Sequence, residues 1–479
     1  MKNALGGLRK AYINLFVNPY SIFFIGFFAL AIVYLFRGFV MHGQESYFFY
    51  RISNFVLENN IPNYDFLSFG GRAFFYSLGS SLFLVLNNML LGISVETLLV
   101  VAPPVFGLLS LILFYCILRS FKLSRNVLSF ACYILILSPV FLYSFTHFTS
   151  FTIPLFLNLL GFFFLIQKKR IFSYLSFLVY LLLPFFGFIH ILFGLLLGFF
   201  YFYSIKKLKR FVPYAFIILL VLFLNNQFVG FGLDIINYQF RQLFFAFGGE
   251  YGLSIFLIFL SVFGLGSLWQ KKYQNLIYYM FFLISIFFLI LNIRYLIYIN
   301  LILCILGAFG LRYIYKLKWT SALIRNLTVI LLIGGVIFSG VSFLTDNVKQ
   351  NPIKGLVDAL DFIEGRISPR DVVFSHEDYG IYINSISKKK NFIDFNRAYA
   401  PRLKERLFSL DKVFYSRSLT TTLNIFNEFK ITHILITPEM KNGLVWNRGN
   451  EGLLYVLDKN PDYFSRMYNE GGYEVWRVL

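Results

Sequence analysis

The chain has 479 residues, of which 58% are hydrophobic, 21% aromatic and 14% charged, and its formal net charge is +20. Soluble globular proteins carry about 25% charged and 45–50% apolar residues, so the composition excludes an ordinary soluble protein. It also excludes a disordered or collagen-like chain. A large positive charge is typical of nucleic-acid binding, and where the charges lie in the chain decides whether that applies here.

Long apolar stretches fill the first 343 residues. Stretches of about 17–25 apolar residues with few charges are typical of membrane-spanning helices. We expect about eleven, and the apolar run 74–92 is a candidate for a twelfth. The first stretch continues through Phe36 and Arg37 without a small-residue cleavage site, so it does not resemble a cleaved signal peptide. The expected spans are 21–40, 95–118, 126–144, 150–167, 171–187, 188–204, 211–225, 252–269, 275–292, 295–313 and 322–343.

Basic residues between the spans predict the orientation. Of the 43 Lys and Arg residues, 19 lie in short segments that contain no acidic residue, and such segments face the cytoplasm. They alternate consistently if 74–92 does not cross. We therefore expect eleven spans, a cytoplasmic N-terminus, and an outer loop 41–94 that includes an interfacial or re-entrant helix. The rest of the chain is nearly neutral, so nothing indicates nucleic acid. The basic segments are 1–20, 119–125, 167–170, 205–210, 270–274 and 312–325.

The composition changes after Phe343. Residues 344–479 carry 19 basic and 17 acidic residues, as a soluble domain does. Helical and strand-like patterns alternate there, which favours an α/β fold. The expected architecture is a polytopic α-helical membrane domain, 1–343, followed by a soluble extracytoplasmic α/β domain, 344–479. A helix is expected near 356–363, and strands near 371–374, 390–394, 431–436 and 473–478.

Acidic residues are rare in the membrane half, and all map to the outer side. Glu45 lies just beyond the first span, at the start of an expected helix. A carboxylate in this place can bind a divalent cation or act as a base. The alternative is an acid favoured by the helix dipole.

Several motifs in order resemble one family. Glu45-x-Tyr-x-x-x-Arg51, Ile61-Pro-x-Tyr-Asp65 and Phe69-Gly-Gly-Arg72 resemble the first outer loop of membrane glycosyltransferases of the GT-C fold, most of all the oligosaccharyltransferase catalytic subunit and its archaeal relatives. Residues 101–107 and 138–147 resemble that family's second span and the approach to its second outer loop. Ser375-His-Glu-Asp-Tyr-Gly380 resembles the Trp-Trp-Asp-Tyr-Gly motif that opens its soluble domain.

The resemblance implies a set of site residues. Glu45 occupies the place of a catalytic acid that binds Mg²⁺ or Mn²⁺. His147 stands where a second acid is usual, so it is a candidate metal ligand and catalytic residue, with a hydrogen-bonded interfacial histidine as the alternative. Glu250 falls in the region of a loop that closes over substrates. Arg294 begins the tenth span and, with Arg72, is a candidate for binding the donor's phosphate.

The acceptor motif departs from the family pattern. Asp378, Tyr379 and Gly380 match and are the candidate acceptor-binding residues, whereas His376 and Glu377 replace the two tryptophans. This departure favours a glycan or lipid acceptor, while the overall topology favours a protein. In the structural alternative Asp378 caps a helix and Gly380 permits a tight turn.

The resulting hypothesis is a multi-pass enzyme of the cell membrane, of the prokaryotic type. It would transfer a sugar or oligosaccharide from a polyprenyl-phosphate or -pyrophosphate carrier to a protein or glycan on the outer face. Nucleotide-binding motifs are absent from the sequence, which favours a lipid-linked donor. The alternatives are a flippase for lipid-linked sugars and a catalytically inactive paralogue.

Overall fold

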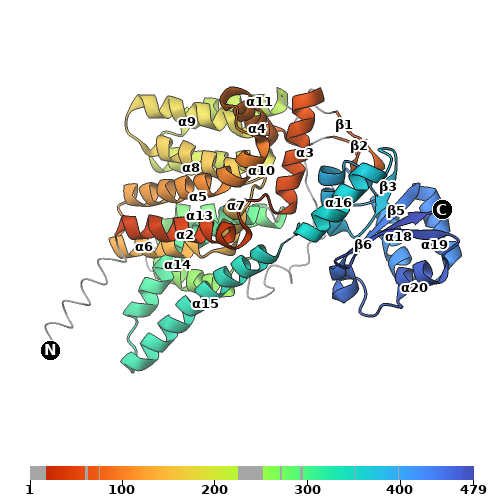
Figure 1. The fold of residues 1–479 in the computed structure, drawn as a ribbon. Helices are drawn as coiled ribbons and strands as arrows, with labels where there is room; N and C mark the ends of the chain where they lie inside the picture. Colours follow the sequence, from red (N-terminus) through yellow and green to blue (C-terminus); the bar gives the residue numbers. More distant parts are fainter. Residues whose placement is uncertain are drawn as a thin grey trace. The chain divides into compact units, whose positions relative to one another are not determined.

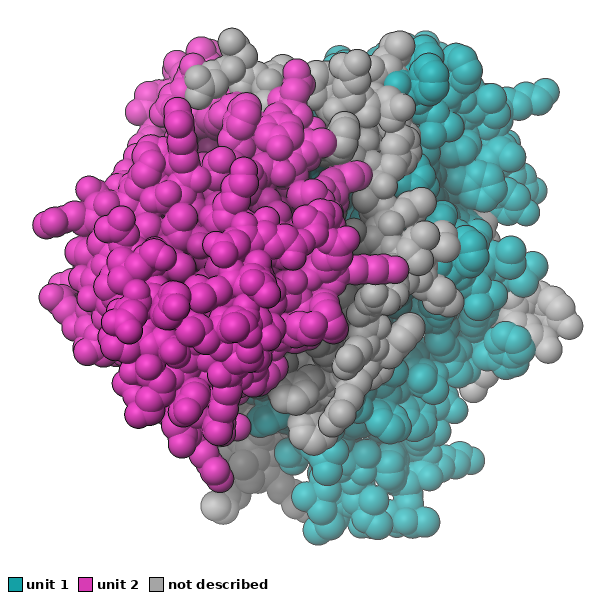
Figure 2. Space-filling view, turned by 90° about the vertical axis from the view of Figure 1, so that its right-hand side faces the viewer, with its two compact units in different colours: residues 1–41, 76–80, 96–349 teal, residues 42–75, 81–95, 350–479 magenta. Residues whose placement is uncertain are grey.

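The computed structural model describes residues 18–59, 63–74, 76–224, 252–269, 272–291, 295–350, 352–397 and 399–479. The chain forms two compact units, coloured separately in Figure 2. Unit 1 comprises residues 1–41, 76–80 and 96–349, and unit 2 comprises 42–75, 81–95 and 350–479. Most of the predicted outer loop thus groups with the C-terminal residues rather than with the apolar helices.

Unit 1 is helical, and its helices follow the expected spans in order (Figure 1). The first begins where the Asn18 side chain accepts a hydrogen bond from Tyr20 N and Pro19 occupies the first helical position. The helices are α2 (Pro19–Arg37), α5 (Val95–Ser120), α6 (Arg125–Ile136), α7 (Pro139–Thr146), α8 (Thr152–Ile166), α9 (Arg170–Leu182), α10 (Phe188–Ser204), α11 (Phe211–Leu224), α12 (Ile255–Trp269), α13 (Lys272–Leu291), α14 (Leu296–Lys316) and α15 (Ala322–Lys349), with short 3-10 turns η2 (Leu183–Phe185) and η3 (Leu208–Arg210).

Several of these helices can cross a membrane. In the described part of the chain, four helices are long and apolar enough: α2, α5, α14 and α15. α6 and α7 together qualify as one span bent by 60°. Most of the other expected spans are apolar helices of 10–17 residues. The polytopic helical fold is confirmed. α4 (Gly79–Leu91), with 13 residues, lies in the segment expected to be interfacial or re-entrant, and its place at the membrane surface stays a prediction from the sequence.

Two contacts with α14 hold neighbouring helices of unit 1 in place. The bend between α6 and α7 lies at Ser138-Pro139, where Ser138 Oγ donates to Asn300 Oδ1 of α14 at 2.8 Å. Helices α12 and α14 touch backbone to backbone: a Cβ at Gly264 would overlap Leu306 O, and one at Gly310 would overlap Leu260 O. Such contacts need glycine, because a larger side chain would hold the helices apart.

Unit 2 is built on a five-stranded sheet of order β4-β3-β5-β7-β6. β3 pairs in parallel with β4 and β5, while β7 is antiparallel to β5 and β6. The four predicted strands are confirmed, and β6 is an additional edge strand. The strands are β3 (Val372–Phe374), β4 (Lys390–Asn391), β5 (Ile431–Ile436), β6 (Phe464–Glu470) and β7 (Tyr473–Val478).

Helices cover this sheet, and aromatic side chains fill its core. The predicted helix at 356–363 is α16 (Lys354–Arg366), which packs against β6 and β7. Trp446 is fully buried, and its Nε1 donates to Phe414 O at 2.8 Å. The remaining elements are α3 (Gln44–Asn59), β1 (Tyr64–Asp65), η1 (Ser68–Gly70), β2 (Arg72–Ala73), α17 (Glu377–Tyr382), the π-helix η6 (Ile383–Ser387), α18 (Leu403–Tyr415), α19 (Leu419–Phe429), the π-helix η7 (Met440–Leu444) and α20 (Gly452–Lys459).

Candidate functional site

The first-loop motif and the acceptor motif lie side by side in unit 2. Glu45 is half-buried in the first turn of α3, and α3 packs against α17 and η6. The Tyr47 and Tyr382 rings meet edge to face at 5.1 Å, and Ser385 Oγ donates to Tyr47 O at 2.9 Å. Residues more than 330 positions apart in the sequence therefore meet at one pair of helices.

Asp378 lies in the first turn of α17 and faces this contact. Its side chain is 45% exposed, and Oδ2 lies 3.2 Å from His376 Nδ1. Burial would raise the pKa of the Asp378 carboxyl, but hydrogen bonds from His376 and Gln44 and the charges of His376 and Arg397 outweigh it, so the pKa is lowered. The helix cap is His376, whose Nδ1 accepts from Asp378 N, so the alternative in which Asp378 caps the helix is wrong.

Gly380 and Tyr379 hold α17 against the sheet. A Cβ at Gly380 would overlap Ile393 O, and Gly380 O accepts from Asn391 Nδ2 at 2.9 Å. Gly380 therefore permits a close backbone approach inside a helix rather than the tight turn expected from the sequence. Tyr379 is buried, and its Oη donates to Glu439 Oε2 at 3.1 Å. Sequence reasoning did not identify Glu439 as a neighbour of this motif.

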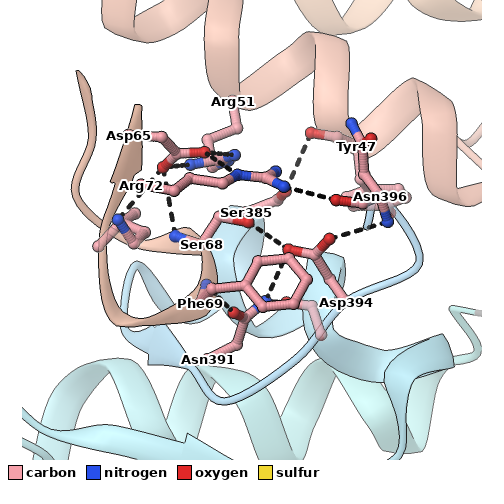
Figure 3. A network of polar contacts seen from close by, with 12 residues as sticks. Tyr47, Arg51, Asp65, Ser68, Phe69, Arg72, Ser385, Asn391, Asp394 and Asn396 are labelled. Atoms are coloured by element: carbon pink, nitrogen blue, oxygen red, sulfur yellow. Dashed lines mark hydrogen bonds and ion pairs between the residues drawn. The ribbon is translucent and has the colours of Figure 1, made fainter. Parts of the chain in front are cut away.

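A buried ionic network holds the segment 64–73 in unit 2 (Figure 3). Arg51 binds Asp65 through two hydrogen bonds of 2.6 and 2.7 Å, and Arg72 Nε lies 3.8 Å from Asp65 Oδ2. Burial alone would raise the pKa of the Asp65 carboxyl, but the charges of Arg51 and Arg72 and the hydrogen bonds from Arg51 and Ser68 N lower it to about 2. The carboxylate is thus ionised and fully engaged.

Arg72 belongs to this network. Its side chain has no exposed surface, its guanidinium lies 5.0 Å from the centre of the Phe69 ring, and Nη1 donates to Asn396 O. Two further hydrogen bonds lie beside it: Ser68 Oγ donates to Asp394, and Phe69 N donates to Asn391 Oδ1 at 2.7 Å. In this position Arg72 ties the segment to the C-terminal residues, and its assignment to donor-phosphate binding stays a prediction from the sequence.

His147 lies in unit 1, at the end of α7. It is 4% exposed, its ring meets Tyr143 edge to face at 5.0 Å, and Nδ1 lies 3.5 Å from Thr146 Oγ1. Thr146 Oγ1 in turn accepts from Asn347 Nδ2 at 2.8 Å. A hydrogen bond from Asn347 of α15 to Thr146 thus fixes the end of α7 beside His147, whose role stays a prediction from the sequence.

The predicted metal ligands do not form a complete set. Among the described residues no three His, Cys, Asp or Glu side chains gather into a group that could hold a metal ion. A stable Mg²⁺ or Mn²⁺ site needs several oxygen or nitrogen ligands. The described residues alone therefore do not complete a site for Mg²⁺ or Mn²⁺, and a metal at Glu45 and His147 stays a prediction from the sequence. Glu250 and Arg294 lie outside the described residues.

A second polar cluster, which sequence reasoning missed, lies in unit 1. Asn158 Nδ2 lies 3.2 Å from Tyr298 Oη, which lies 2.5 Å from His190 Nδ1. The three side chains come from α8, α10 and α14 and are at most 4% exposed. A polar residue in each of three apolar helices is the only sequence signal for it.

Comparison with solved structures identifies the architecture. The Archaeoglobus fulgidus oligosaccharyltransferase, in a structure tethered to an acceptor peptide containing the NVT sequon, aligns with a TM-score of 0.59 at 12% identity, over 96% of this chain and 74% of its own. ArnT from Cupriavidus metallidurans aligns in the apo state with a TM-score of 0.55 at 12% identity, over 98% of both chains. It was also solved bound to undecaprenyl phosphate.

The arabinofuranosyltransferase AftD from Mycobacteria aligns with a TM-score of 0.52 at 12% identity, over 96% of this chain and 40% of its own. One structure of the A. fulgidus enzyme is a complex with Zn and sulfate. Protein-family models and the sequences of characterised proteins give no match. Likeness at this identity concerns the fold, and it extends over nearly the whole chain. The protein therefore has the GT-C fold, the architecture that these three glycosyltransferases share.

Proposed function

We propose that the protein is an integral membrane glycosyltransferase that transfers a sugar or oligosaccharide from a polyprenyl-phosphate or -pyrophosphate carrier to an acceptor on the outer face of the cell membrane. The observation that carries this proposal is the alignment with ArnT over 98% of both chains. ArnT has been solved with undecaprenyl phosphate, and the A. fulgidus enzyme with a dolichol-phosphate and an inhibitory peptide.

The described geometry supports an acceptor site at α3 and α17. Glu45 and Asp378 lie on two helices in contact, and Gln44, next to Glu45, hydrogen-bonds to Asp378. Both carboxylates keep exposed surface, so an acceptor can reach them. Carboxylates accept hydrogen bonds from an incoming nucleophile and can take its proton.

In the proposed reaction the acceptor atom attacks the anomeric carbon of the donor sugar. The bond from that carbon to the phosphate oxygen breaks, the electron pair stays on the lipid phosphate, and Glu45 takes the acceptor's proton. We assign the stabilisation of the leaving phosphate to Arg294, from its place just before α14. The assignments of His147 and Glu250 as further catalytic residues stay predictions from the sequence.

Sugar transfer by the purified protein in lipid nanodiscs tests this function, with a polyprenyl-phosphate sugar as donor. Loss of a general base typically costs 10²–10⁴-fold in rate, so we expect Glu45→Gln to lower kcat at least about a hundredfold. Glu96→Gln is a matched control, because Glu96 is also an acid in the first turn of a helix and is exposed.

Undiminished sugar transfer by Glu45→Gln would show that Glu45 is not the catalytic base. Movement of the carrier across liposome membranes without any sugar transfer would support the flippase instead. Donor binding without turnover would support the inactive paralogue.

A further inference from the structure

The sheet of unit 2 contains a switch point in its connections. β3 and β5 are adjacent and parallel. From β3 the chain continues to β4 on one side of the pair, and from β5 it continues to β6 and β7 on the other. Ligands of open α/β sheets bind at such points, just outside the carboxyl ends of the strands. β7 is antiparallel to β5 with Glu474 opposite Ile436, so the start of β7 lies at this same edge.

Three side chains from different segments gather at the edge. Tyr379 comes from α17, Glu439 follows β5, and Tyr473 begins β7. Tyr379 Oη donates to Glu439 Oε2 at 3.1 Å. Burial, and then the charge of Glu439, raise the pKa of Tyr473 to about 12, so its hydroxyl remains a donor at neutral pH.

Among the residues that the structure describes, the Tyr473 hydroxyl lacks a hydrogen-bond partner, and the Glu439 carboxylate has no counter-charge. Tyr473 is 3% exposed, and its buried Oη has no hydrogen-bond partner within the described residues. Glu439 is half-buried and, in the described part of the chain, forms no ion pair. Glu377 and Glu474 of the same unit, in contrast, are paired with Arg397 and Lys441. A buried hydroxyl without a partner costs about 1–3 kcal/mol, which a bound ligand or water would recover.

We propose that Glu439, Tyr473 and Tyr379 form a binding site for neighbouring hydroxyl groups of a sugar, and that the acceptor is therefore a glycan. A carboxylate only accepts hydrogen bonds, whereas the Tyr473 hydroxyl has its proton to donate. A sugar hydroxyl does both and satisfies both groups, whereas an ammonium group only donates. The site adjoins Asp378 on α17, where His376 and Glu377 replace the tryptophans of the related motif.

Binding of a simple glycoside to the full chain in nanodiscs tests this site. The probe is methyl α-mannopyranoside, observed by saturation-transfer NMR and titrated for affinity, with its 2,3-dideoxy analogue as ligand control. We expect Glu439→Gln to weaken binding about tenfold and Tyr473→Phe about fivefold, the effect of one hydrogen bond each. Asp462→Asn changes an exposed acid of the same unit and should bind as the unmodified protein does.

Unchanged affinity in both site variants overturns the inference, provided that their melting temperatures match that of the unmodified protein. Equal binding of the dideoxy analogue, or binding of an Asn-x-Thr peptide but not the glycoside, overturns it as well. Tyr473→Phe keeps the aromatic ring, so it preserves the packing if Glu439→Gln does not fold.

That the bound glycan is the acceptor rests on the proposed function, whereas the binding assay contains no donor and does not depend on sugar transfer. A protein that binds the glycoside through Glu439 and never transfers sugar contradicts the proposed function alone. Sugar transfer to a glycan with the same acceptor KM in Glu439→Gln contradicts the inference alone.

Discussion

Each unit contains a buried polar network, and the two are built from different chemistry. In unit 2, Asp65 lies between Arg51 and Arg72 as a charged cluster. In unit 1, Asn158 Nδ2 donates to Tyr298 Oη, which lies 2.5 Å from His190 Nδ1, so this network consists of an amide, a hydroxyl and an imidazole and contains no permanently charged group. Between apolar helices neutral groups avoid the cost of burying charge, whereas unit 2 buries charges that lie in contact with opposite charges.

Removing the carboxylate should break the charged network most severely. Asp65→Ala leaves Arg51 and Arg72 buried without their counter-charge, and breaking a buried pair in this way costs about 3–5 kcal/mol. We expect a matching loss in the free energy of unfolding of unit 2, measured by pulse proteolysis with a C-terminal tag. Asp458→Ala is the control, because that side chain is 78% exposed. Equal stability of the two variants would mean that the network does not hold unit 2 together.

Gly380→Ala should disturb the contacts around Asp65 indirectly, through Asp394. The new Cβ overlaps Ile393 O and crowds Asp394, which binds Ser68. Overpacking typically costs 1–3 kcal/mol, and contact with rigid backbone places this change at about 3 kcal/mol. The same proteolysis assay measures it. Gly365→Ala, also in a helix of unit 2 but with open space around it, should not destabilise the protein.

Acid should weaken unit 2 through Asp65. Its pKa in the folded chain is about 2, below the value of about 3.9 in an unfolded chain. The stabilisation is therefore complete above about pH 5 and is lost progressively as the pH falls to about 1, by about 2.5 kcal/mol in total. Proteolysis across this pH range with an acid-stable protease checks it, and Asp65→Asn should show a shallower dependence. An identical pH dependence would assign the effect to other carboxyls.

The neutral network should respond least. Tyr298→Phe removes the hydroxyl that joins Asn158 to His190 and keeps the ring stacked on Phe193 at 4.2 Å. The expected loss is about 1 kcal/mol, the net value of a typical hydrogen bond. Thermal unfolding in detergent measures it. Tyr203→Phe, which alters an exposed tyrosine of α10, should leave the melting temperature unchanged. If Tyr298→Phe lost as much stability as Asp65→Ala, the two networks would not differ in the way described.

Local patterns predicted much of the fold, because apolar length and strand alternation depend on neighbours in the sequence. The positions of α2 to α15 and of β3, β5 and β7 follow from such patterns. β6 did not, since this edge strand carries Ser, Arg, Asn and Glu without a clear apolar face. The 60° bend at Ser138-Pro139 divides an expected straight span.

The site was less predictable, because its contacts join distant parts of the chain. Asp65 and Arg72 are recognisable as charged residues of the outer loop, but their buried positions depend on residues more than 300 positions away, such as Asn396. The sequence around Glu439 has no motif, and only the order of the strands places it next to Tyr379. Asp378 stays a predicted acceptor-binding residue, whereas the close approach of Gly380 to Ile393 O depends on a contact that the sequence does not reveal.

The glycine contact between α12 and α14 has a consequence for how the chain is made. Synthesis delivers α12, then α13, and only then α14, so Gly264 has no partner until Gly310 has left the ribosome. During that interval α12 presents its small-residue face to lipid or to the insertion machinery. This contact within unit 1 therefore forms late, after Gly310 of α14 has been made.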